Sequence, residues 1–335
     1  MKASFEKYIL HFKRPSGTSR GVLLEKETWF LTIEENGKKG IGECGVFRGL
    51  SYDDRLDYSD KLQWVCDNIH LGKETLWEAL REWPSIQFGV EQAFLSLQSS
   101  DPKILFPSAF TEGQKSIPIN GLVWMGEPEF MKQQIDEKIK EGFHCIKLKI
   151  GALDFEKELN LIRYIRANFS PETIEIRVDA NGGFDKSEAL DKMNQLAEFK
   201  IHSIEQPIKQ KQYDSMSALC LQTSLPIALD EELIGVVNYN DKENLLRKIR
   251  PQYIILKPSL VGGFKGSEEW IEIAEKLGIG WWITSALESN IGLNAIAQWT
   301  FTLENSMPQG LGTGSLFTNN IESNLFVKNG QLWFG

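Results

Sequence analysis

Acidic and basic side chains end a series of short apolar runs in the middle of the chain. These polar residues recur at nearly constant spacing, and in order they are Lys149, Asp179, Glu205, Asp230, Lys257 and Ser285. If the runs are neighbouring strands, Asp179, Glu205 and Asp230 lie side by side and repel one another unless a cation lies between them. Three carboxylates without His or Cys favour Mg²⁺ over zinc, with Mn²⁺ as an alternative.

Three lysines flank these carboxylates. Lys147 and Lys149 are two positions apart in one run, so their side chains share one face of a strand, and Leu148 points to the other face. Lys257 ends a later run and is expected across the barrel from that pair. A lysine whose pKa is lowered by neighbouring cations can act as a base near neutral pH. The pattern predicts removal of a proton next to a carboxylate, with a metal holding the enediolate.

Each of these residues has a simpler explanation when it is taken alone. Asp179 precedes Ala-Asn-Gly, which is typical of a turn, and Glu205 precedes Gln-Pro, where a strand can end. Lys147 could face solvent, and Lys257 could end its strand before a proline. Six such coincidences at one repeat spacing are harder to explain than one site, so we favour a site assembled at the mouth of a barrel.

The runs that carry these residues alternate with amphipathic segments. Seven β-rich runs lie between residues 118 and 286. The helical segments between them include 127–142, 154–169, 186–199, 212–223 and 266–278. Alternating strands and helices form parallel sheets with right-handed crossovers. At least seven repeats favour a (β/α) barrel over a doubly wound sheet. The chain also lacks the GxGxxG motif that a doubly wound dinucleotide-binding sheet would carry after its first strand.

A mixed lobe precedes this regular part. Two strand patterns joined by an Asn-Gly turn, then two helical patterns, predict an α+β lobe; they cover 28–33, 38–45, 53–69 and 88–97. A second Asn-Gly hairpin is expected at 326–334. The predicted division is a capping domain over 1–105, a barrel over 115–314 and a segment over 315–335 that returns to the capping domain.

Composition excludes several classes of partner. The chain has 335 residues, with 37 Lys and Arg against 46 Asp and Glu, for a formal net charge of −9. No basic cluster suggests binding to nucleic acid or to an anionic membrane. No apolar run is long enough to span a bilayer, and the first residues lack a signal-peptide pattern. We therefore expect a cytoplasmic protein with a small-molecule partner.

The motifs at the ends of the runs occur together in a known family. They are KLK (147–149), VDAN (178–181), EQP (205–207), LDE (229–231), LKPSLVGG (256–263) and SALESNIGLNA (285–295). In this order they resemble the muconate lactonizing subgroup of the enolase superfamily, and within it the o-succinylbenzoate synthases. GIGECG (40–45) and PSIQFGVEQA (84–93) resemble that family's capping domain, so the resemblance covers nearly the whole chain. It implies an α/β fold, a modified TIM barrel of the (β/α)7β type with an α+β capping domain built from both ends of the chain.

The resemblance also implies a reaction. A lyase of the hydro-lyase type would carry out the syn dehydration of 2-succinyl-6-hydroxy-2,4-cyclohexadiene-1-carboxylate to o-succinylbenzoate, a step of menaquinone biosynthesis. By resemblance, Asp179, Glu205 and Asp230 would bind Mg²⁺. Lys149 would remove the α-proton and protonate the leaving hydroxyl, Lys257 would stabilise the enediolate from the other side, and Lys147 would hold the carboxylate.

The residues that recognise the dicarboxylate substrate are less sharply indicated. Asn181 and Ser285 could donate hydrogen bonds to carboxylates, and Gly312 within GLGTG could offer a backbone N–H, although this stretch could equally be a mobile loop. Arg20, in a loop that resembles a pocket-closing loop of the superfamily, is a candidate anion contact.

Related activities remain as alternatives. They are N-succinylamino acid racemase, dipeptide epimerase and muconate cycloisomerase, which use the same lysines. Dipeptide epimerases usually carry Asp-x-Asp where this chain has Gly312-Thr313-Gly314, which disfavours them. A non-catalytic binding protein on a barrel would not need both lysines and three acids. A homo-oligomer is also possible within this family.

Overall fold

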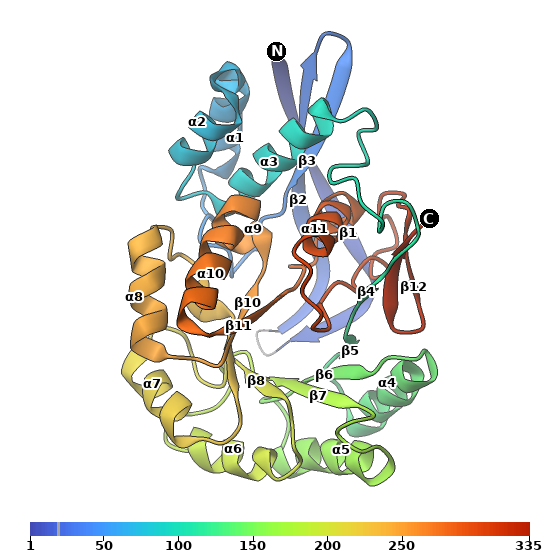
Figure 1. Ribbon diagram of the computed structural model, residues 1–335, viewed down its shortest axis with the longest axis vertical. Coiled ribbons are helices and arrows are strands. Elements are labelled where there is room, and N and C mark those ends of the chain that lie inside the picture. The colour runs from blue at the N-terminus through green and yellow to red at the C-terminus, as the bar shows by residue number, and fades with distance from the viewer. Residues whose placement is uncertain (19–20) are drawn as a thin grey trace.

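The computed structural model describes residues 1–18 and 21–335, except the side chains of residues 16–20, and shows two lobes (Figure 1). The lower lobe in this view contains a parallel sheet in the order β11-β10-β9-β8-β7-β6-β5. Its strands are β5 (Gly121–Val123), β6 (Cys145–Lys149), β7 (Glu175–Asp179), β8 (Ser203–Glu205), β9 (Ile227–Leu229), β10 (Tyr253–Leu256) and β11 (Gly280–Ile283). Consecutive strands are neighbours, as a repeated βα unit requires, so the predicted parallel sheet is confirmed.

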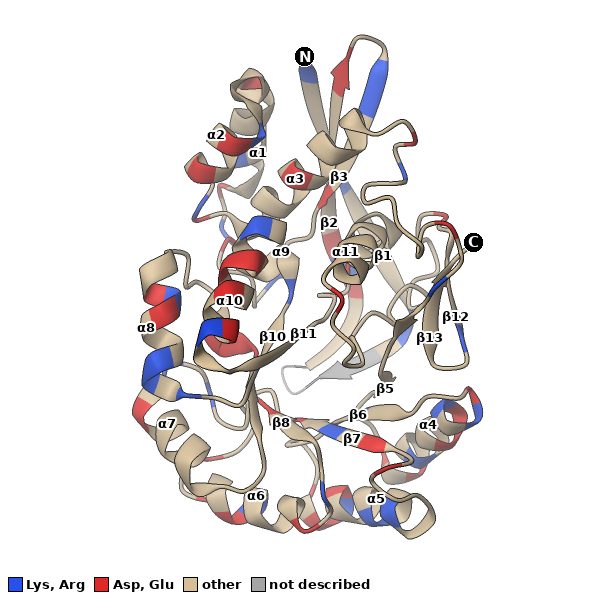
Figure 2. Cartoon of the chain, viewed as in Figure 1, with Lys and Arg blue, Asp and Glu red and all other residues tan. Residues whose placement is uncertain are grey.

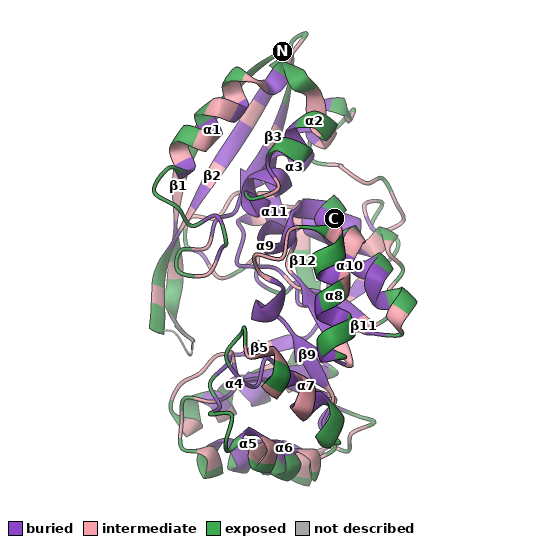
Figure 3. Ribbon diagram, turned by 90° about the vertical axis from the view of Figure 1, so that its left-hand side faces the viewer, coloured by how far each residue is buried: buried purple, intermediate pink, exposed green. Residues whose placement is uncertain are grey.

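Helices cover the outer face of this sheet (Figure 1). They are α4 (Pro128–Lys140), α5 (Phe155–Asn168), α6 (Ala189–Ala197), α7 (Tyr213–Gln222), α8 (Tyr239–Ile249), α10 (Gly263–Leu277) and α11 (Asn290–Thr302). Local sequence sets their ends. Pro128 occupies the first turn of α4, where its missing N–H costs nothing, and left-handed Gly278 ends α10. Charged residues lie along these outer helices (Figure 2), while buried residues gather on the strands and inner helix faces (Figure 3).

A short segment before the C-terminus closes the sheet into a barrel. Gln309 forms a parallel bridge to Ile119, just before β5, and Gly310 forms one to Thr284, just after β11. The amide of Gly310 donates to the carbonyl of Ile283 at 2.8 Å. This eighth strand position, occupied by only two residues, completes the predicted (β/α)7β arrangement and confirms the modified barrel.

The upper lobe is the α+β capping lobe. Its antiparallel sheet is in the order β1-β2-β3, and one face packs against helices. These elements are β1 (Lys2–Thr18), β2 (Gly21–Glu35), β3 (Lys38–Cys44), α1 (Tyr58–Asp67), α2 (Gly72–Ala79) and α3 (Pro84–Gln98). The predicted hairpin between β2 and β3 is confirmed, with Asn36 and Gly37 at φ 50° and 77° in its turn. The long strand β1 was not predicted, because its apolar residues do not alternate regularly.

The last part of the chain makes two separate contacts. Phe317 bridges to Phe12 on β1, and Thr318 N donates to His11 O at 2.9 Å, so this stretch lies against the capping lobe. The predicted terminal hairpin is confirmed as β12 (Leu325–Lys328) and β13 (Gln331–Phe334), but β13 pairs with β4 (Ile117–Pro118) rather than with the β1-β2-β3 sheet. The division at 1–105, 115–314 and 315–335 stays a prediction.

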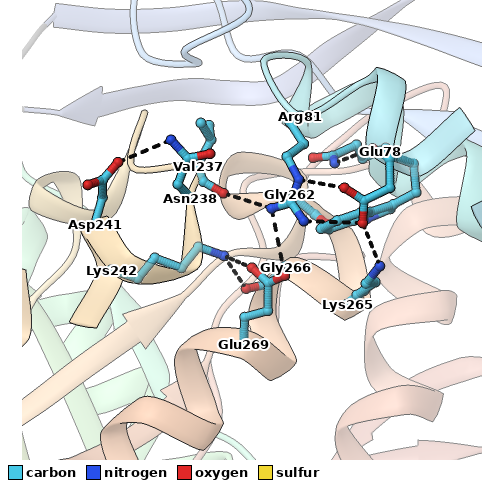
Figure 4. A network of polar contacts seen from close by, with 12 residues as sticks. Glu78, Arg81, Val237, Asn238, Asp241, Lys242, Gly262, Lys265, Gly266 and Glu269 are labelled. Atoms are coloured by element: carbon cyan, nitrogen blue, oxygen red, sulfur yellow. Dashed lines mark hydrogen bonds and ion pairs between the residues drawn. The ribbon is translucent and has the colours of Figure 1, made fainter. Parts of the chain in front are cut away.

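Side chains at the end of α2 and just after it join the capping lobe to the barrel (Figure 4). Arg81, two residues after α2, pairs with Glu78 of that helix and donates to the carbonyl of Val237, before α8, at 3.3 Å. Its guanidinium also lies 3.8 Å from Glu269 on α10, which pairs with buried Lys242 of α8 at 2.8 Å. The two lobes therefore share an ionic network on the side away from β6 and β7.

No helix in the described ranges is long and apolar enough to cross a bilayer.

Candidate active site

Five of the six predicted ionic residues stand where neighbouring barrel strands end. Lys149 and Asp179 are register partners across β6 and β7, and Asp179 and Glu205 are register partners across β7 and β8. Asp230 and Lys257 follow the last residues of β9 and β10. Parallel strands end at one edge of the sheet, so the repeat spacing of the sequence brings these groups together.

The acids and lysines pair closely. Lys147 Nζ lies 2.9 Å from Asp179 Oδ2 and also contacts the Glu205 carboxylate. Lys149 Nζ lies 2.7 Å from Asp179 Oδ2. Lys257 contacts the Asp230 carboxylate and lies 3.9 Å from Glu205 Oε1. The predicted lysines and carboxylates thus form one connected ionic cluster.

Burial and charge act against each other in this cluster. Burial alone would raise the pKa of Asp179, but the three lysine ammoniums hold that pKa below its ordinary range. Burial also opposes the charged form of Lys147, yet Asp179 and Glu205 raise its pKa. For Glu205, burial and the charge of Asp179 raise the pKa despite Lys147. At Glu205, burial and the neighbouring carboxylates therefore outweigh the lysines.

The three carboxylates are the candidate metal ligands. Within residues 1–18 and 21–335, no three His, Cys, Asp or Glu side chains stand close enough to hold an ion as they are, because lysine ammoniums lie between Asp179, Glu205 and Asp230. Glu205 Oε1 is nevertheless buried and accepts no hydrogen bond from any described residue. Three buried carboxylates with an unsatisfied oxygen are the hard donors that Mg²⁺ or Mn²⁺ prefers, so the residues fit such an ion.

Asn181 lies against the cluster in a strained backbone conformation. Its φ is 44°, a left-handed value that Asn tolerates better than most residues. Its Oδ1 accepts from Lys149 Nζ at 2.7 Å, and its Nδ2 donates to Glu231 Oε1 at 3.0 Å. Asn181 was predicted to bind substrate; it lines the cavity and also holds the amine of Lys149, so substrate binding stays a prediction.

Two of the other three predicted substrate contacts lie in the described part of the chain and line the cavity. Ser285 and Gly312 line the same cavity as Lys147, Lys149 and Lys257. Ser285 Oγ lies 2.6 Å from Thr313 Oγ1, so the hydroxyl pair joins the two loops that carry these residues. Arg20 lies outside the described residues.

The cavity has a volume of about 530 Å³ and opens between the lobes. Lys13 and Arg14, near the end of β1, line it together with Trp124, after β5. These three were not predicted. The charged pair lies six residues or more before Arg20, and two consecutive basic residues, Lys13 and Arg14, are the signal in the sequence that could have indicated them. No signal in the sequence indicated Trp124, because an aromatic residue after a strand is usually part of the core.

The chain is similar to proteins of known family and structure over most of its length. Residues 131–334 match the model of the family described as Enolase C-terminal domain-like. The chain is 47% identical to an o-succinylbenzoate synthase from Desulfotalea psychrophila, over 99% of this chain and 98% of the other. A crystal structure of MenC from the same organism superposes with a TM-score of 0.89 at 43% identity, covering 99% of both chains. A hydrophobic dipeptide epimerase from a Flavobacteria bacterium is 25% identical over 69% of this chain and 68% of its own length.

Proposed function

Since the chain belongs to the enolase superfamily, and within it to the o-succinylbenzoate synthase family, we propose that it dehydrates 2-succinyl-6-hydroxy-2,4-cyclohexadiene-1-carboxylate to o-succinylbenzoate. The observation that carries this assignment is 47% identity to an o-succinylbenzoate synthase over 99% of the chain. The enzyme is therefore a lyase, and loss of water makes it a hydro-lyase acting in menaquinone biosynthesis.

Lys149 is the proposed base. Its amine lines the cavity at the end of β6, where a substrate carbon could approach it. Removal of the proton next to the carboxylate and loss of the neighbouring hydroxyl make the ring aromatic. Because the elimination is syn, the proton that Lys149 gains can be passed to the leaving hydroxyl on the same face of the ring, which departs as water.

Lys257 and Lys147 are proposed to stabilise negative charge. Lys257 reaches the cavity from the end of β10, away from the β6 strand that carries the base. Its ammonium can approach the carboxylate oxygens as they gain charge. Lys147 is buried beside Asp179 and Glu205, and its ammonium can hold the reacting carboxylate in place.

Asp179, Glu205 and Asp230 are the proposed ligands of Mg²⁺, with Mn²⁺ as a substitute. Members of the superfamily are metal-dependent, and the unsatisfied Glu205 oxygen fits this role. When bound there, the ion would supply positive charge beside the substrate carboxylate. The lysines that now neutralise these acids would then have no carboxylate to pair with and could face the cavity.

The substrate is a dicarboxylate, and the remaining cavity walls suit its succinyl arm. Ser285 and the backbone N–H of Gly312 can donate to carboxylate oxygens, and Lys13 and Arg14 place further positive charge on the capping side. Arg20 stays a prediction, as do a cytoplasmic location and a homo-oligomer.

N-succinylamino acid racemase or another epimerase or cycloisomerase of the subgroup is the second candidate. The same lysines could take a proton from one face of an amino acid and return it on the other. The epimerase relative is more distant than the synthase, and Gly312, Thr313 and Gly314 offer no carboxylate to hold a substrate ammonium.

A direct comparison of substrates tests the assignment. Steady-state kcat/KM is measured with the cyclohexadiene substrate and with N-succinyl amino acids, at the same Mg²⁺ concentration. We expect dehydration to be much the faster reaction. Faster racemisation, or no dehydration at all, would overturn the assignment in favour of the second candidate.

A further inference from the structure

A buried polar cluster joins the lobes directly behind the substrate cavity. Lys26 and Glu43 reach it from β2 and β3 of the capping lobe. Ser259, Glu288 and Ser289 reach it from the barrel, where Ser285, Ala286 and Leu287 line the cavity. None of the roles proposed above uses this cluster, although it contains two fully buried carboxylates. Buried charges are costly unless they are paired, so a specific role is expected.

Glu288 binds two segments that carry active-site residues. One carboxylate oxygen accepts from Ser259 Oγ at 2.5 Å, and the other accepts from Ala286 N at 2.7 Å. Ser259 is two residues after Lys257, in the short helix α9 (Pro258–Val261). Glu288 therefore ties the residues that follow the catalytic lysine to the loop that follows β11.

Leu287 lies between these bonds in a strained conformation. Its φ is 61°, which is rare for a residue with a bulky side chain. Leu287 lines the cavity and packs against Leu10 of β1 and Phe317. Such strain persists only where the surrounding structure holds it, and it is concentrated at functional sites. The bond from Ala286 N to Glu288 spans the strained residue.

Glu43 secures the other side of the same loop. Its carboxylate accepts from Ser289 N at 2.8 Å, from Ser289 Oγ at 2.5 Å and from Gly292 N at 2.9 Å. Thr28 Oγ1 donates to it at 2.7 Å. A strand of the capping lobe therefore caps the first turn of α11, immediately after Glu288.

Lys26 supplies the positive charge of the cluster. Its ammonium is buried and has no hydrogen-bond partner among the described residues. Its charge lowers the pKa of Glu288, although burial is the larger effect and leaves that pKa raised. A Cβ built on Gly45 would lie 3.3 Å from Glu288 Cγ and 3.8 Å from Lys26 Nζ, so the two side chains lie close together across the lobe interface without a direct hydrogen bond.

We propose that Glu288 is a positioning residue for the dehydration, which holds strained Leu287 in the substrate cavity and fixes the segment after Lys257. Lys26 and Glu43 make this arrangement depend on docking of the capping lobe. The proposal rests on the proposed function for its kinetic readout, because the substrate used is the cyclohexadiene. A displacement of about 1 Å at a reacting group can cost about 100-fold in rate.

Substitutions of Glu288 test the role. Glu288→Ala removes both bonds, and we expect kcat/KM to fall about 100-fold. Glu288→Gln keeps the shape: its carbonyl oxygen can accept from Ala286 N, while its NH₂ can donate to Ser259 Oγ. This conservative variant should recover most of the activity, whereas a catalytic proton donor would not be replaced by an amide.

Glu91 provides a matched control. It is also a buried carboxylate that joins the lobes, and it accepts from Phe264 N at 2.6 Å and from Lys265 N at 3.1 Å at the start of α10. It does not line the cavity. Glu91→Ala should lower the melting temperature as much as Glu288→Ala does but leave kcat and KM of the folded enzyme unchanged. Equal kinetic losses in both variants would overturn the positioning role.

Hydrogen exchange gives a readout that does not need turnover. Glu288→Ala should speed exchange in the peptide that contains residues 285–289, and Glu91→Ala should not. If this peptide is unchanged in Glu288→Ala, the proposal is wrong whatever the substrate. If exchange rises but the wild-type enzyme dehydrates nothing, the positioning role stands and the proposed function fails.

Lys26→Met tests the link across the lobes. The single variant should lower kcat/KM, and it should cost much less when Glu288 is already Gln, because the charge that Lys26 faces is gone. Arg81→Met, in the network of Figure 4, removes a half-buried cation contact between the lobes and should show no such coupling. Additive losses for Lys26→Met and Glu288→Gln would contradict the inferred interaction.

Discussion

Lys149 and Asp179 are directly paired across two neighbouring strands, and their side chains meet with 2.7 Å between Nζ and Oδ2. The ends of β6 and β7 are thus in register, so backbone pairing between these strands positions both the proposed base and a proposed metal ligand. Because Lys147 precedes Lys149 by two positions, its side chain is on the same face and reaches the same Asp179 oxygen.

The first prediction concerns the base. Lys149→Ala should lower kcat by at least about 100- to 10,000-fold, the usual contribution of a general acid or base. The fold should be retained, since Asp179 keeps its contact with Lys147. Stopped assays on the cyclohexadiene substrate and thermal melting measure the two effects. Lys192→Ala, on the surface of α6, is the control, and near-normal turnover by Lys149→Ala would remove that lysine from the base role.

The second prediction concerns Asn181. Asn181→Ala removes the amide oxygen that holds the Lys149 amine, and a bond to a charged group contributes about 1.5–3 kcal/mol. We therefore expect kcat to fall about 10- to 100-fold. Because the amide orients the base, KM should change less than kcat. A rise in KM alone would indicate that Asn181 binds substrate, as its sequence context first suggested.

The third prediction concerns the metal. Treatment with EDTA should abolish turnover, and Mg²⁺ or Mn²⁺ should restore it. Asp230→Asn should weaken Mg²⁺ binding, measured by titration calorimetry, by roughly 10- to 100-fold or more, since losing even an outer partner of a metal site costs that much. Asp241→Asn, on the surface of α8, should bind Mg²⁺ like the wild type. Turnover that survives full metal removal would exclude the three-carboxylate site.

Most of the barrel and its ionic cluster were predictable from sequence, because the same βα repeat sets the order of the strands and the positions of the charged residues. Asp179 and Glu205 each end an apolar run, these runs recur at nearly constant spacing, and parallel strands end at one edge of the sheet. The hairpin at Asn36 and Gly37 was equally local, because the turn needs positive φ.

Contacts between distant segments were not predictable in this way. Lys13 and Trp124 come to one cavity from different lobes, and no periodicity relates them. The terminal hairpin was recognised, but its partner β4 consists of only two residues, too short to give a strand pattern. Glu288 lies within the SALESNIGLNA motif, but its sequence context does not indicate its role, because its bonds to Ser259 and Ala286 depend on how two loops meet.

The fourth prediction concerns stability and pH. Burial raises the pKa of Glu91 from its ordinary 4.5 to about 8, although the amides of Lys265 and Phe264 oppose the shift. The folded protein therefore holds a proton that the unfolded chain releases above pH 4.5. Stability is greatest below that pH and falls as pH rises towards 8, by about 5 kcal/mol at most. The neighbouring charges of Glu268 and Lys73 act on the same carboxyl and change the size of the effect, not its sign.

Glu91→Gln is the variant that isolates this effect. Its side chain is neutral at every pH and keeps an oxygen for the α10 amides. The wild type should lose stability relative to Glu91→Gln between about pH 5 and 8, measured by urea unfolding at several pH values. Parallel pH profiles for the two proteins would show that Glu91 is charged when folded.

The fifth prediction concerns the contact between β3 and α3 in the capping lobe. A Cβ on Gly42 would lie 2.0 Å from the carbonyl oxygen of Gly89, and one on Gly89 would lie 2.3 Å from Cys44 Sγ. The atoms nearest to a Cβ on Gly42 belong to the backbone of Gly89 and Ala93 in α3, so they cannot move without shifting the helix. Overpacking in a core costs about 1–3 kcal/mol, and Gly42→Ala should reach or exceed that upper value in urea unfolding.

The same strand carries Glu43, so the effect of Gly42→Ala should not stop at stability. If β3 moves away from α3, the carboxylate that caps α11 moves with it, and Ser289 loses its partner. Exchange in residues 285–289 should then rise in Gly42→Ala as in Glu288→Ala. Gly37→Ala, in an open turn with positive φ, strains the same sheet without displacing β3 and should leave that peptide protected.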